Sequence, residues 1–120
     1  MTYKLEFTKM ARQEFDEIYR FYLETYSDKQ PAVEVAQGIQ AAIASVLPEP
    51  EEALSFDARI GFSTDKNHEL YFTISEQYLI FFVVIDKTVV IVHFLRTRAV
   101  DMNHLKLLFE NFSERTLKVR

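Results

Sequence analysis

Cysteine and tryptophan are absent from this chain of 120 residues, which also has only two glycines and three prolines. Without cysteine there is no disulfide, no thiolate metal ligand and no cysteine nucleophile, as suits a reducing cytosol. The scarcity of glycine and proline argues against long flexible linkers. The longest apolar runs, Tyr78 to Ile85 and Val89 to Val92, are far shorter than the roughly 20 residues that span a bilayer. Because no signal peptide is visible either, the sequence predicts a soluble cytoplasmic protein without a membrane partner.

The apolar residues that are present suffice for one folded domain. Hydrophobic residues make up 48% of the chain, with 11 phenylalanines and 6 tyrosines, and this length fits a single domain with its own core. We expect residues 1–112 to form that domain and residues 113–120 to form a C-terminal tail.

The net charge of −4 is unevenly distributed. Five basic and eleven acidic residues give residues 1–57 a net charge of −6, whereas nine basic and seven acidic residues give residues 58–120 a net charge of +2. A surface that contacts phosphate or an acidic partner therefore belongs to the second half, and the overall charge gives nucleic-acid binding no support.

The first half has the pattern of a strand followed by two helices. Alternation of polar and apolar residues over 3–7 predicts a half-buried strand. Thr8 is a good N-cap for a helix whose apolar stripe runs to Tyr26. A second helix carries Pro31 near its start and ends before Pro48, so the two form an antiparallel pair.

The second half has strand patterns. Apolar strand segments lie at residues 70–74, 78–85 and 89–95, with a further edge strand expected from Arg59 to Phe62. Asp86 and Lys87 form a tight hairpin turn between the two most apolar segments. Residues 102–112 form a last helix with Asp101 as its N-cap.

Together these elements predict an α+β fold of two layers. The N-terminal strand and the helical hairpin pack on a sheet of four or five mainly antiparallel strands, and a C-terminal helix follows. The first strand must join the sheet, because only then is its apolar face buried.

Four stretches carry a resemblance to a known family: Tyr3 to Phe15, Asp16 to Tyr22, Leu47 to Pro50, and Gln77 to Asp101 with its apolar hairpin. In this order the chain resembles the RelE/ParE superfamily of toxins from bacterial type II toxin–antitoxin modules, of the plasmid stabilisation kind. The resemblance implies a toxin that a cognate antitoxin neutralises by wrapping around it. It also implies one of two targets, since RelE-like toxins cleave mRNA on the ribosome and ParE-like toxins inhibit DNA gyrase.

Departures from the RelE-like pattern favour the second of these targets. The strand at residues 70–74 lacks the lysines that RelE-like nucleases carry, and Leu79 stands where they often have arginine. A net charge of −4 also suits ribosomal RNA poorly. We therefore interpret the chain as ParE-like, a growth-inhibiting toxin that binds DNA gyrase and is not an enzyme. A RelE-like ribosome-dependent mRNA endoribonuclease and a non-toxic, diverged peptide-binding module remain alternatives.

The candidate site lies at the end of the last strand, where the resemblance implies a basic pair. Arg96 and Arg98 are two residues apart, so both project from one strand face and could grip a phosphate or an acidic antitoxin. Arg59 and Lys66 would complete a basic rim that contacts the target or the antitoxin. In the nuclease interpretation, the catalytic candidates are Arg96, Arg98 and His93.

His93 is expected to share a strand face with Ile91 and Leu95 and to face away from Arg96. In so apolar a strand, a packed and hydrogen-bonded core histidine is the simpler interpretation. The other histidines are His68 and His104. Because the three are scattered without metal-ligand spacing, we expect no metal and no cofactor.

The expected partners are a cognate antitoxin and, as target, DNA gyrase or the ribosome. The alanine-rich second helix and an exposed sheet edge both offer interfaces, which leaves a homodimer open as well.

Overall fold

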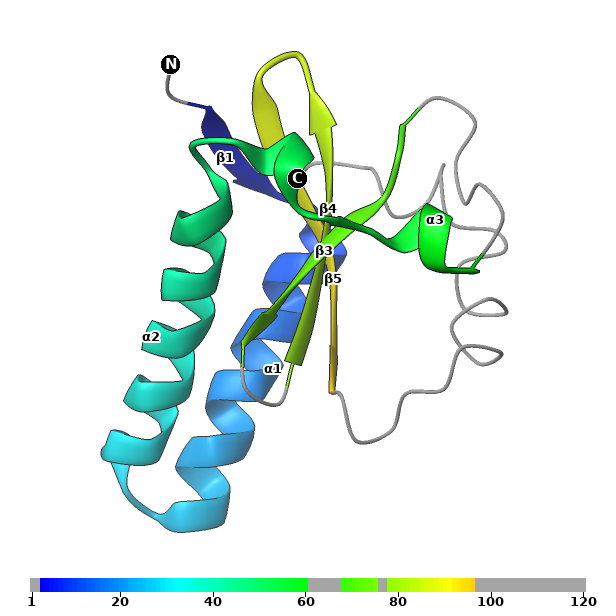
Figure 1. Ribbon diagram of the computed structural model, residues 1–120. Coiled ribbons are helices and arrows are strands. Elements are labelled where there is room, and N and C mark those ends of the chain that lie inside the picture. Colours follow the sequence, from blue (N-terminus) through cyan, green and yellow to red (C-terminus); the bar gives the residue numbers. More distant parts are fainter. Residues whose placement is uncertain (1–2, 61–67, 76–77, 97–120) are drawn as a thin grey trace.

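Five strands form one mixed sheet, and two long helices cover one of its faces (Figure 1). The computed structural model describes residues 3–60, 68–75 and 78–96. The elements in chain order are β1 (Lys4–Phe7), α1 (Lys9–Tyr26), α2 (Lys29–Val46), the 3₁₀ turn η1 (Pro50–Glu52), β2 (Leu54–Ser55), α3 (Phe56–Ile60), β3 (Tyr71–Ser75), β4 (Tyr78–Ile85) and β5 (Thr88–Arg96). The expected α+β class, N-terminal strand and helical hairpin are confirmed. No helix of the described part is long and apolar enough to cross a bilayer.

The helical hairpin is set by its caps. The buried hydroxyl of Thr8 accepts a hydrogen bond from the Ala11 amide at 3.0 Å and starts α1. Ser27 adopts a left-handed conformation, φ 51°, and ends that helix, while the Asp28 carboxylate accepts from the Gln30 amide and starts α2. These short-range signals confirm the predicted break between the two helices.

The sheet has the strand order β1-β5-β4-β3-β2, with β1 parallel to β5 and all other neighbours antiparallel. The turn from β4 to β5 consists of Asp86 and Lys87, both at positive φ, as a two-residue hairpin turn of the primed type requires. Farther along, His93 pairs with Phe81 but Ile91 pairs with Phe82, so Val92 is the extra residue of a β-bulge.

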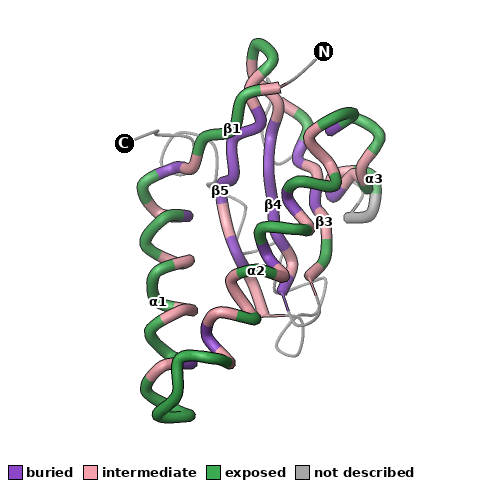
Figure 2. The backbone as a smooth tube through the Cα atoms, turned by 90° about the vertical axis from the view of Figure 1, so that its left-hand side faces the viewer, coloured by how far each residue is buried: buried purple, intermediate pink, exposed green. Residues whose placement is uncertain are grey.

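The sheet separates two apolar clusters. On the helix side, α1 and α2 pack against inward residues of β4 and β5, among them Ile80, Phe82 and Ile91. On the outer face, Phe81 lies under Phe56 of α3, with ring centroids 5.0 Å apart and nearly perpendicular rings. Figure 2 shows the buried residues concentrated along β4 and β5, while the outward sides of α1 and α2 are exposed. Both faces of these central strands are therefore covered, as their doubly apolar sequences predict.

One expected strand is wrong. Residue 59 lies in the short helix α3, not in an edge strand, and the sheet instead ends at the two-residue strand β2, which pairs with β3. The reason is local, because the Ser55 hydroxyl accepts from the Ala58 amide at 3.2 Å and thereby caps a helical turn. The Phe56 amide in turn donates to the Leu70 carbonyl at 2.8 Å. Residues 61–62, the expected last helix at 102–112 and the expected tail at 113–120 lie outside the described residues.

Candidate functional site

A hollow of about 300 Å³ lies where the ends of β4 and β5 meet α1. Its lining comes from these three elements: Glu14, Glu17, Ile18, Phe21, Tyr78, Phe94 and Arg96. Arg96, the one basic candidate whose side chain the structure describes, lines this hollow. The position follows from topology, because β5 extends past the end of β1 and its last residues face α1 directly.

Arg96 is held against an exposed aromatic ring. Its guanidinium carbon lies 5.9 Å from the centroid of the Phe21 ring, and Phe21 is 46% exposed. Strand register places Arg96 opposite Tyr78 on the helix side of the sheet. A cation over an aromatic face contributes about 0.5–1 kcal/mol at an exposed site. The arrangement presents a planar cation beside a large apolar surface.

Tyr78 forms the buried floor of the hollow. Burial, reinforced by the hydrogen bond with Tyr22, raises the pKa of the Tyr78 hydroxyl to about 12, although the charge of Arg96 acts in the opposite direction. The phenol is therefore neutral throughout the physiological range and serves as a hydrogen-bonding group, not as a base.

The raised pKa of Tyr78 predicts an alkaline loss of stability. The folded-state pKa of about 12 exceeds the ordinary 10.0, so the contribution of the neutral phenol is complete below pH 10 and is lost as the pH rises toward 12. We expect Tyr78→Phe to be less stable than the parent chain by about 1 kcal/mol at neutral pH, through loss of the hydrogen bond with Tyr22. Urea unfolding at a series of pH values should then show this difference shrinking above pH 10. A difference that stays constant would contradict the raised pKa.

Glu14 closes the edge of β5 beside the hollow. Strand β1 stops pairing where the Thr8 amide donates to the Ile91 carbonyl at 2.9 Å. Beyond that point Glu14 Oε1 accepts from the Phe94 amide at 2.9 Å, and Glu14 Oε2 lies 2.5 Å from His93 Nδ1. The carboxylate thus replaces the missing strand and ties α1 to the end of β5, a known way to protect a sheet edge.

This dual contact gives Glu14 a measurable role in stability. Glu14→Ala leaves the Phe94 amide without its carboxylate acceptor, and we expect the free energy of unfolding in urea to fall by about 1–3 kcal/mol. Glu17, which is exposed and lies three residues further along α1, is the matched control, and Glu17→Ala should change the free energy of unfolding by less than about 0.5 kcal/mol. Equal effects of the two substitutions would show that the edge contact does not stabilise the fold.

His93 and Arg96 lie on opposite faces of the sheet. His93 pairs with Phe81, whose ring centroid lies 6.4 Å from the imidazole, whereas Arg96 pairs with Tyr78 on the helix side. The expectation that His93 faces away from Arg96 is confirmed. The expectation that Ile91 shares its face is wrong, because the bulge at Val92 interrupts the alternation and leaves Ile91 in the helix-side cluster.

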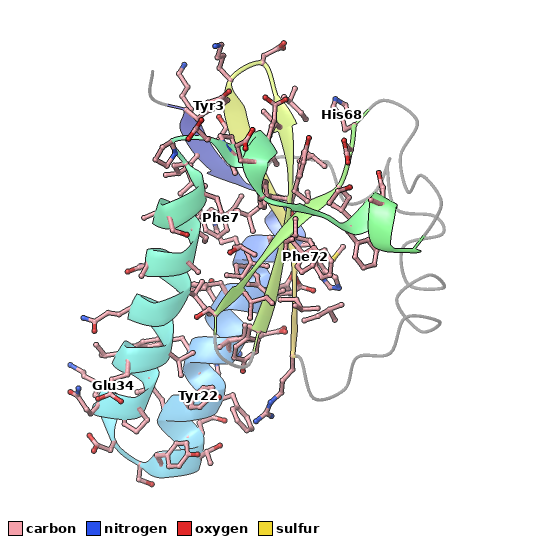
Figure 3. The ribbon with its side chains drawn as sticks, in the orientation of Figure 1. Tyr3, Phe7, Tyr22, Glu34, His68 and Phe72 are labelled. Carbon is pink, nitrogen blue, oxygen red and sulfur yellow. The ribbon has the colours of Figure 1, made fainter. Side chains whose placement is uncertain are left out.

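The remaining candidate residues lie either outside the described part of the chain or away from the hollow. The side chain of Arg59, and the whole of Lys66, Arg98 and His104, lie outside that part of the structure. His68 precedes β3 at the end of the sheet opposite Arg96 (Figure 3). In residues 3–60, 68–75 and 78–96, no group of three histidine, aspartate or glutamate side chains is placed to hold a metal ion.

Three residues of the site were not expected from the sequence. Phe21 had a recognisable signal, since it is a large apolar residue off the apolar stripe of its helix. Tyr78 is indistinguishable by pattern from other core aromatics. Glu14 gave no signal, because its contacts are with residues about 80 positions later in the chain.

Comparison with known protein families gives one match that covers most of the chain. Residues 5–100 match the family model described as "ParE toxin of type II toxin-antitoxin system, parDE". A search of curated proteins gave no match.

Proposed function

This chain belongs to the ParE toxin family of type II toxin–antitoxin systems, and we propose that it acts by binding DNA gyrase through the surface around Arg96 and Phe21. ParE toxins pair with a cognate ParD antitoxin. The antitoxin of this chain is then expected to prevent gyrase from binding this surface, either by covering the surface or by holding the toxin in an inactive complex.

The observation that carries the proposal is the Arg96–Phe21 pair. Arginine and large aromatic residues are enriched among the side chains that dominate protein–protein binding energy. Here the two are preassembled, with the guanidinium 5.9 Å from the ring centroid and Phe21 46% exposed. Preassembly lowers the entropic cost of ordering these side chains on binding.

The described residues favour binding over RNA cleavage. Cleavage by 2′-hydroxyl attack needs a base, an acid and a cation around one phosphate. Near Arg96 the described side chains offer a tyrosine with a raised pKa and a histidine that contacts Glu14 and faces the other side of the sheet. The carboxylates of Glu14 and Glu17 also line the hollow, but their negative charges would repel a phosphate beside Arg96, and Glu14 is already held by the Phe94 amide and His93.

A supercoiling assay tests the proposal directly. Purified protein should block ATP-dependent supercoiling of relaxed plasmid by gyrase, and adding the cognate antitoxin should restore it. The same preparation should leave mRNA intact in a translating extract. Unimpaired supercoiling together with codon-dependent mRNA cleavage would overturn the proposal in favour of the ribosome-dependent nuclease.

A further inference from the structure

Strand β1 leaves one edge of the described sheet open. It stands at the end of the strand order, and its even-numbered residues bond to β5: the Lys4 amide donates to the Lys87 carbonyl and the Thr8 amide to the Ile91 carbonyl, both at 2.9 Å. In a parallel pair the bonding residues alternate. The amide and carbonyl groups of Leu5 and Phe7 therefore point away from β5, along the open edge.

Apolar surface lies beside this edge. Leu5 is 40% exposed, and Leu5 and Phe7 line a groove of about 330 Å³ between the start of α1 and the end of α2. Most of the exposed lining of the groove is apolar, with Ile39 and Ile43 contributing from α2 and Leu47 from the residue that follows it. An unpaired strand with apolar residues along one face is a template for pairing with another strand.

The side chains of β1 are complementary to those of a second copy of the strand that runs antiparallel to it. In an antiparallel pair centred on Leu5, Leu5 meets Leu5 of the second copy, and Tyr3 lies opposite Phe7 on the helix side. On the other face Lys4 lies opposite Glu6, twice by symmetry, and both side chains are exposed. Opposite charges facing each other across strands are stabilising.

Other registers fail for physical reasons. Centring the pair on Lys4 or Glu6 would place two lysines or two glutamates face to face, and like charges directly opposite each other are destabilising. Centring on Leu5 avoids this repulsion and pairs the whole strand through its outward amide and carbonyl groups. The match is between the strand and its own copy, and such a two-fold contact closes as a dimer.

We infer that two copies of this chain associate through their β1 strands, antiparallel and centred on Leu5, to form one continuous sheet across a two-fold axis. The contact covers the exposed side chain of Leu5 and satisfies the outward backbone groups of the strand. Its small extent implies a weak dimer, formed at high toxin concentration and open to displacement by a tighter partner.

Charge reversal gives a test specific to this two-fold contact. Sedimentation of the full-length chain over a concentration series up to the millimolar range should show a monomer–dimer equilibrium. Lys4→Glu alone and Glu6→Lys alone each replace two attractive pairs by two repulsive ones, and each should weaken the dimer roughly tenfold or more. An equimolar mixture of the two variants, and the double variant Lys4→Glu/Glu6→Lys, should both regain the parent affinity.

A backbone variant tests the edge itself. Leu5→Pro removes an amide that points outward and makes no bond to β5, so the fold is expected to tolerate it, as edge strands do. The variant should be monomeric throughout. If it fails to fold, the charge variants still decide the matter.

Two results would overturn the inference. A parent chain that stays monomeric throughout the range, but whose binding to a cognate antitoxin is abolished by Leu5→Pro, assigns the edge to an antitoxin strand. A dimer that the charge-reversed mixture fails to restore lies on another surface.

Discussion

Replacing Arg96 with alanine is expected to raise the concentration needed to inhibit gyrase by roughly 30-fold or more. A side chain that dominates an interface contributes about 2 kcal/mol or more, and each 1.4 kcal/mol is a factor of ten in affinity. Arg96 fits that class because it is half-buried against Phe21 and presents a planar cation at the rim of the hollow. The measurement is a titration of supercoiling inhibition with the purified variant. Phe21→Ala should cause a loss of similar size, because it removes both the apolar surface and the ring that orients Arg96.

Two controls separate the stacked geometry from the charge. Arg96→Lys keeps the charge but lacks the planar guanidinium, so it should lose most of the inhibition. Lys9→Ala removes an exposed cation at the opposite end of α1 and should leave the titration unchanged. If Arg96→Ala and Lys9→Ala inhibit as well as the parent while both remain folded, the hollow is not the gyrase-binding surface.

The parts of the fold that follow from the sequence are those with short-range causes. Thr8 caps α1 through a contact three residues away, and Ser27 and Asp28 end one helix and begin the next. Asp86 and Lys87 take up the positive φ angles that a two-residue hairpin demands. Alternation alone gives β1 an apolar and a polar face, and the apolar face requires that β1 join the sheet.

The parts that do not follow depend on distant contacts. The bulge at Val92 moves Ile91 and His93 to opposite faces, and nothing in the run of β-branched residues marks it. An edge strand was expected to begin at Arg59, but an anchor on Leu70 and the buried ring of Phe56 place that residue in a helix. In both places tertiary contacts override the local secondary-structure propensity.

The same distinction applies to the candidate site. The resemblance to known toxins directed attention to Arg96, yet the residues that define its chemistry lie on α1 and β4, far away in sequence. Phe21 orients the guanidinium, Tyr78 forms the floor of the hollow, and Glu14 fixes the strand end that carries Arg96. A basic residue at a strand end predicts the position of a site. Its neighbours in the fold determine whether it binds a phosphate or contacts a protein.

The second large effect is expected from Phe81→Ala, which should lower the free energy of unfolding by about 3–5 kcal/mol and the melting temperature by roughly 15 °C. Phe81 is fully buried on the outer face of the sheet, where its ring contacts those of Phe56 and Phe72. Removing it leaves a cavity under α3 that the rigid strands cannot collapse to fill. Calorimetry and urea unfolding measure the loss, and Ile74→Ala, which alters a half-exposed side chain on β3, should change it by less than about 0.5 kcal/mol.

Phe82→Ala distinguishes the two faces of the same strand. Phe82 is as deeply buried as Phe81 but packs on the helix side. Its ring is stacked on that of Tyr71, with the two ring centroids 5.6 Å apart. Both substitutions should destabilise the protein by a similar amount, but Phe81→Ala alone should also speed hydrogen exchange at the Phe56 amide, which donates to Leu70 and anchors α3. Such local opening below the global unfolding free energy is expected where a short helix depends on a few apolar contacts. Equal exchange at Phe56 in the two variants, at matched stability, would mean that α3 does not depend on the outer cluster and that the sheet buries a single cooperative core.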